Sequence, residues 1–134
     1  MKKYLILMAI AILLPLLSSC GKSHTEYDPA RTTELAEKAD NGDLTEDEIS
    51  EGLDLVELGI EKWDQIIDEA YSKAGNSQEF RKLQNSLFIE QNLDPMQDLV
   101  FRVTYQAQKF PDLKERGKEV ESKYYEVKQK GRRY

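Results

Sequence analysis

The segment TEDEISEGLDLVELGIEKWDQIIDEAYSK, residues 45–73, is the most strongly patterned part of the chain. Its apolar residues recur at intervals of four and three, at Ile49, Leu53, Val56, Ile60, Trp63, Ile67 and Ala70. This period places the residues along one face of an α-helix. Thr45 and Glu48 have the spacing of a capping box, and Leu44 and Ile49 can pack around it as a hydrophobic staple. The pattern therefore predicts one long helix that ends near Lys73.

Cap and turn signals on both sides of this segment predict shorter helices. Asp28-Pro29 is typical of an N-cap followed by proline, and Asn41-Gly42 follows a helix expected to end near Ala39. Asn76 with Glu79, or Ser77 alone, predicts a third start, and Asp94 is expected to cap a fourth helix with Pro95 at its first position.

Pro111 should break or kink the helical pattern before a final segment, because the residue before a proline resists the helical conformation. No segment of the chain alternates between apolar and polar residues with period two. We therefore expect an all-α fold: a small bundle of four to five mostly antiparallel helices around one long central helix, forming a single domain over residues 29–134.

Acidic and basic residues are unevenly distributed along the chain. Residues 26–69 hold 16 acids and 3 bases, whereas residues 70–134 hold 9 acids and 13 bases. Such asymmetry can mark a tail that binds anions. The simpler interpretation is that the two halves face each other within the bundle.

The N-terminus has the organisation of an export signal. Lys2 and Lys3 precede an apolar stretch over residues 5–17, which is shorter than the roughly 20 residues that span a bilayer. The residues Leu17-Ser18-Ser19-Cys20 resemble the lipobox of bacterial lipoproteins, in which a leucine and small residues precede a cysteine. The resemblance implies cleavage between Ser19 and Cys20 and a covalent lipid on Cys20, which is the only cysteine in the chain.

The lipobox resemblance covers the signal segment, residues 1–19, and the remaining domain matches no family that we recognise. Residues 20–28 are predicted to be the lipidated cysteine and a flexible tether. Gly21 stands where an aspartate would retain a lipoprotein at the inner membrane, so the resemblance points to the outer membrane. The periplasmic and surface faces of that membrane both stay open.

The chain lacks the residue patterns on which most catalysis depends. Its single histidine, His24, falls in the predicted tether, and the only thiol is consumed by lipid. No phosphate-binding loop, paired-cysteine metal pattern or nucleophile elbow is present. We therefore predict no catalytic residues, no enzyme activity, and no cofactor other than the covalent lipid on Cys20.

Residues 41–48 resemble the second half of an EF-hand calcium loop when Gly42 is aligned with the invariant glycine. Ala39 then occupies the third position and cannot ligate calcium, and capping already accounts for Thr45 and Glu48. We predict no metal site here. The residues left as candidates for an acidic metal site are Asp40, Asp43 and Glu48.

Gly52 and Gly59 lie seven residues apart, on one face of the long helix. Each costs about 1 kcal/mol relative to alanine in a helix interior. The close approach of another helix, or of a partner, would offset that cost, and internal packing is the commoner reason.

Aromatic residues alternate with bases in the C-terminal third of the chain, at Phe101, Tyr105, Tyr124, Tyr125 and Tyr134. Tyrosine and arginine are enriched at protein interfaces, whereas an exported acidic protein rarely meets nucleic acid. We therefore expect no nucleic-acid partner. The leading hypothesis is a membrane-anchored, non-catalytic protein-interaction module that binds an envelope protein through a surface the sequence does not define. An acidic calcium or ligand binder and a structural envelope component are the alternatives.

Overall fold

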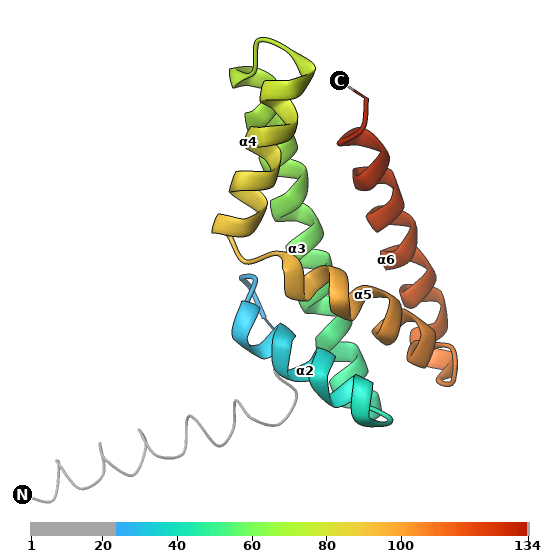
Figure 1. Cartoon of the computed structure of the whole chain (residues 1–134). Coiled ribbons are helices and arrows are strands. Elements are labelled where there is room, and N and C mark those ends of the chain that lie inside the picture. Colours follow the sequence, from blue (N-terminus) through green and yellow to red (C-terminus); the bar gives the residue numbers. More distant parts are fainter. Residues whose placement is uncertain (1–23, 134) are drawn as a thin grey trace, which may run out of the picture.

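The computed structural model describes residues 24–133, which form five α-helices and no strand. These are α2 (Pro29–Asn41), α3 (Glu46–Lys73), α4 (Ser77–Glu90), α5 (Asp94–Ala107) and α6 (Pro111–Lys130). The 28-residue helix α3 is the centre of the bundle; α4 runs back beside it, α5 crosses it, and α6 lies on its other side (Figure 1). The predicted all-α bundle with one long central helix is confirmed.

The predicted signal peptide over residues 1–19, the Leu17-Ser18-Ser19-Cys20 motif and its cleavage position lie outside the described residues. None of the helices within residues 24–133 has the length and apolar content that crossing a membrane requires.

The predicted helix starts are confirmed at three of four positions. Thr45 Oγ1 accepts a hydrogen bond from the backbone N–H of Glu48 at 3.2 Å, and the Glu48 carboxylate accepts one from the backbone N–H of Thr45 at 2.9 Å. These two bonds complete the capping box. The side chains of Asp28 and Asn76 cap α2 and α4 in the same way, by accepting a bond from a backbone N–H three residues later.

The prediction that Asp94 caps α5 is wrong, because the helix already includes Asp94 and follows Leu93 without a side-chain cap. Asn92 adopts a left-handed conformation with φ of 55° at the end of α4. The N–H of Leu93 then bonds the Phe88 carbonyl at 3.2 Å, and the Leu93 side chain is fully buried. This tight C-terminal turn leaves no room for a separate capping residue before α5.

Helix α5 packs closely on α3 at the two glycines. A Cβ atom on Gly59 would lie 2.6 Å from Met96 Cγ, and one on Gly52 would lie 2.9 Å from Val103 Cγ2. Both distances are shorter than van der Waals contact, so only glycine allows this approach. Internal packing, rather than a partner, therefore explains Gly52 and Gly59.

The acidic first half and the basic second half of the chain face each other, as predicted. Seven ion pairs between distant segments join them: Asp40–Arg102, Asp43–Lys109, Asp54–Arg116, Glu57–Arg116, Glu57–Lys123, Asp64–Lys130 and Asp68–Lys130. The partners of these pairs are 59 to 66 residues apart. Since both partners advance together along the chain, α3 and α6 run parallel to each other, whereas the consecutive helices α3 and α4 run antiparallel (Figure 1).

The second half of the predicted tether is part of the folded domain. Tyr27 is only 8% exposed, and its hydroxyl donates a hydrogen bond to the Asn92 carbonyl at 2.9 Å. Burial raises the pKa of this hydroxyl to about 12. His24 contacts Glu51 of α3. The prediction of a flexible tether over residues 20–28 is therefore wrong for residues 24–28. Burying the Tyr27 ring in the core lowers the free energy more than leaving the ring in solvent.

We expect Gly59→Ala to lower the free energy of unfolding by about 1 kcal/mol, although alanine is the better helix former. Overpacking a core by a methyl group costs about 1–3 kcal/mol, and helix propensity returns about 1 kcal/mol. Urea denaturation followed by circular dichroism measures the change. In a Met96→Ala background the same substitution should cost less, because the Cγ atom it meets is gone. A Gly59→Ala chain that is stabilised in both backgrounds would contradict the packing described here.

Candidate interaction surface

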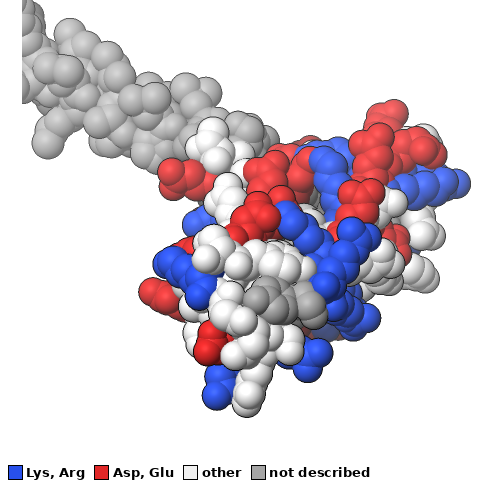
Figure 2. Space-filling view, turned by 90° about the horizontal axis from the view of Figure 1, so that it is seen from above, with Lys and Arg blue, Asp and Glu red and all other residues white. Residues whose placement is uncertain are grey.

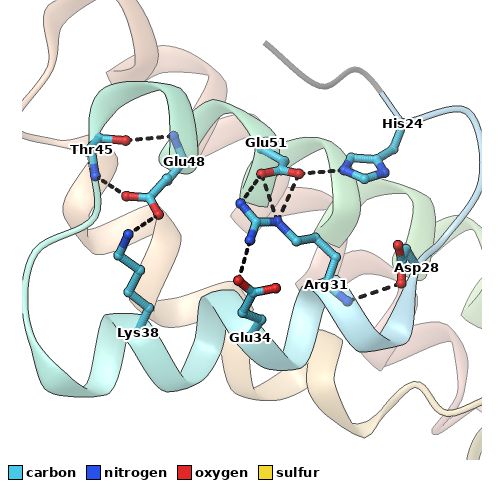
Figure 3. A network of polar contacts seen from close by, with 8 residues as sticks. All are labelled: His24, Asp28, Arg31, Glu34, Lys38, Thr45, Glu48 and Glu51. Atoms are coloured by element: carbon cyan, nitrogen blue, oxygen red, sulfur yellow. Dashed lines mark hydrogen bonds and ion pairs between the residues drawn. The ribbon is translucent and has the colours of Figure 1, made fainter. Parts of the chain in front are cut away.

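A network of charged side chains joins residues 24–28 and α2 to the first turns of α3 (Figure 3). At its centre is Glu51, whose side chain is 7% exposed. Arg31 donates to this carboxylate from Nη2 at 2.7 Å and from Nε at 3.0 and 3.1 Å. His24 Nε2 lies 2.7 Å from the second carboxylate oxygen. Arg31 also pairs with the exposed Glu34 at 2.8 Å.

The contacts of Glu51 explain how a nearly buried carboxylate stays charged. Burial raises the pKa of Glu51, but the hydrogen bonds from Arg31 and His24 together outweigh burial and hold the pKa below its ordinary value of 4.5. The pKa of the Arg31 guanidinium is raised, chiefly by the bonds to Glu51. His24 and Arg31 both bond Glu51, so this network is a structural clamp that holds residues 24–28 and α2 on α3.

The candidate metal ligands are distributed over separate ion pairs. Asp40 pairs with Arg102, Asp43 pairs with Lys109 at 2.9 Å, and Glu48 bonds both Lys38 and the backbone of Thr45. Burial raises the pKa of Glu48, but the bonds from Lys38 and Thr45 outweigh it and lower the pKa below 4.5. Across residues 24–133 no group of three or more His, Cys, Asp or Glu side chains is arranged to hold a metal ion.

A connected set of aromatic rings runs from the core to the surface of α5 and α6. Trp63 of α3 contacts Phe88 and Tyr124, with ring centroids 5.6 and 5.5 Å apart. Phe101 meets Tyr124 at 5.2 Å and Tyr125 at 6.0 Å. Phe101 and Tyr125 are each 43% exposed, and Tyr105, one turn beyond Phe101 on α5, is 67% exposed. We call Phe101, Tyr105 and Tyr125 the aromatic surface.

A hollow of about 330 Å³ lies among α3, α4 and the start of α5. Trp63 contributes to its lining together with Phe88 and the 64% exposed Ile89 of α4. The remaining lining residues are polar: Gln84, Asn85, Asp94 and Gln97. The hollow therefore combines an apolar part with amide groups and one carboxylate.

The sequence drew attention to the aromatic residues of α5 and α6 but not to their geometry. Tyr124 is buried, whereas Phe101, Tyr105 and Tyr125 are exposed, and no local pattern separates these two groups. Glu51 was missed altogether. The sequence feature that could have indicated the burial of Glu51 is the pair of apolar residues Leu55 and Ile66, which lie outside the predicted stripe. Both are buried, so α3 has a second buried face.

Comparisons of the chain with protein-family models, with curated proteins and with solved structures found no match.

We expect Glu51→Gln to lower the free energy of unfolding at pH 7 by about 2 kcal/mol, because Arg31 then loses its buried counter-charge. The folded-state pKa of Glu51 lies below 4.5, so its contribution to stability is present above pH 4.5 and is lost as the pH falls below that value. The stabilities of the wild-type and variant chains should therefore converge toward pH 3, as urea denaturation across pH 3–7 would measure.

Glu34→Gln is the matched control, because Glu34 pairs with the same arginine but its side chain is 67% exposed. Its effect should stay below about 1 kcal/mol. Equal losses in the Glu34 and Glu51 variants, or a constant difference between wild type and Glu51→Gln at all pH values, would contradict the assignment of Glu51 as the centre of the clamp.

Proposed function

We propose that this chain is a bacterial lipoprotein that serves as a membrane-anchored, non-catalytic protein-interaction module of the cell envelope. The observation that carries the interaction part is the aromatic surface, in which Phe101, Tyr105 and Tyr125 expose 43–67% of their area on adjoining helices. Aromatic rings supply large contact areas at a low cost in side-chain entropy, and they are enriched where proteins bind one another.

The anchor part of the proposal rests on the Leu17-Ser18-Ser19-Cys20 motif. A lipid on Cys20 would bring the bundle to the membrane, and two or more acyl chains are needed for stable attachment because one binds reversibly. With Gly21 after the cysteine, we propose the outer membrane as the site. No observation on the described residues favours the calcium-binding alternative, since Asp40, Asp43 and Glu48 each face a base.

The anchor predicts that Cys20→Ala abolishes incorporation of radiolabelled palmitate and releases the chain from the membrane fraction. Labelling and fractionation of cells that express either form measure both effects. Ser18→Ala is the matched control, because a small residue is kept at a position that forms no bond with lipid. Unlabelled wild-type chain, or a Cys20→Ala chain that is still labelled, would refute lipidation at this residue.

The interaction surface predicts site-specific crosslinking in cells. A photoreactive amino acid in place of Tyr105 should give an adduct of defined mass with an envelope protein, and Tyr125→Ala in the same chain should weaken that adduct several-fold. The same photoreactive group in place of Gln65, an exposed residue of α3 on the side that borders Thr25 and Glu26, should give no such adduct. If positions 105 and 65 give the same products or none, the aromatic surface is not an interaction site.

A further inference from the structure

We infer that the hollow beside Trp63 and the aromatic surface form one groove that binds an acidic amphipathic helix of the partner protein. This inference rests on the proposed function and names the chemistry of the partner.

The two features are continuous along α5. Gln97 lines the hollow and lies close enough to Tyr124 to oppose the rise that burial causes in the pKa of its hydroxyl, while Phe101 and Tyr105 follow Gln97 at intervals of four residues. Residues at this spacing lie on one side of a helix and extend about 12 Å from the first to the third. An apolar row on a partner could therefore contact Tyr105 and Phe101 and place a large side chain in the hollow, against Trp63 and Phe88.

The surrounding backbone favours a helical occupant. The hollow and the aromatic surface are bordered by helices, whose backbone groups are hydrogen-bonded internally and offer no edge to which a strand could add. A partner that buries its backbone here must satisfy its own N–H and C=O groups. An amphipathic helix does so while presenting apolar residues at intervals of three and four.

Three cations lie along the groove. Lys128 of α6 is 5.9 Å from the centre of the Tyr124 ring, Arg132 is one turn further and acts electrostatically on Tyr124, and Arg81 lies one turn before Asn85 on α4. None of the three belongs to the ion pairs formed within residues 24–133.

A second row of bases on α6 does form ion pairs, unlike Lys128. Arg116, Lys123 and Lys130 each pair with carboxylates of α3. Figure 2 shows Lys and Arg side chains interspersed with Asp and Glu side chains around a region of uncharged residues at this end of the bundle. The cations at the groove are thus available to a partner, and glutamate or aspartate residues flanking its apolar row would complement them. Asp94 is the one carboxylate among the residues that line the hollow, and Glu121 and Glu126 border Tyr125 at the aromatic surface.

Trp63 provides a direct readout, because it is the only tryptophan of the chain and lines the hollow. Two designed helical peptides would share one apolar face and carry either glutamate or lysine at every polar position. Each is titrated into the full-length chain in non-ionic detergent while Trp63 emission is recorded. We expect the acidic peptide to shift the emission saturably and to bind at least tenfold more tightly than the basic peptide.

Charge reversal tests the role of the cations. The double variant Lys128→Glu/Arg132→Glu should invert the preference between the two peptides. Lys62→Glu, a single charge reversal on the side of α3 that borders Thr25 and Glu26, should leave the preference unchanged. Equal binding of both peptides, or a preference that the double variant does not alter, overturns the inference.

The remaining outcomes separate this inference from the proposed function. If position 105 crosslinks to an envelope protein but the acidic peptide does not bind, the inference of a helix-binding groove is wrong. The proposed function as a protein-interaction module then still stands. Failure of both experiments overturns both. Sedimentation equilibrium of the chain in detergent tests whether a second copy of the chain occupies the groove. If the chain self-associates and Lys128→Glu/Arg132→Glu abolishes that association, the inference that the groove binds an acidic helix of a different protein is wrong.

Discussion

The need to cover the apolar surface of α3 determines the arrangement of the bundle. Twelve of its 28 residues are buried, and they lie on more than the single stripe that the four-three spacing indicates. Neither α2 nor α4 nor α5, at 13 or 14 residues, is long enough to cover such a helix alone. Each covers one part, and α6 covers a further side along the length of α3. The hollow beside Trp63 lies where α4 and α5 meet on this surface.

The ion pairs between the two halves of the chain add little to the stability of this packing. Pairs on the surface contribute about 0–1 kcal/mol each, so the apolar core must supply most of the free energy of folding. Arg116 pairs with both Asp54 and Glu57, and Lys130 pairs with both Asp64 and Asp68. These bases of α6 therefore each bridge two carboxylates that lie one turn apart on α3.

Local sequence patterns were sufficient to predict the features of the structure that depend on residues close together in the chain. The capping box at Thr45, the long stripe and the glycine positions belong to this class. Contacts between distant segments were not predictable in this way. Gln106 accepts a hydrogen bond from the Leu44 N–H at 2.7 Å and donates one to the Gly42 carbonyl at 3.2 Å, which fixes the loop between α2 and α3 from 62 to 64 residues away. The burial of Glu51 and the exposure of Tyr105 depend on tertiary packing in the same way.

The packing of His24 and Tyr27 against the bundle limits how far the domain could stand from a lipid on Cys20. Only three residues separate Cys20 from His24, and at about 3.6 Å per residue the chain between those two positions spans at most about 14 Å. Helix α3 alone is about 42 Å long at 1.5 Å per residue. Thr25 and Tyr27 border Leu58, Glu61 and Gln65, which face away from Trp63 around α3. A lipid-attached domain would therefore rest close against the bilayer with its Trp63 side turned outward, and only partners that reach that shallow layer could bind it.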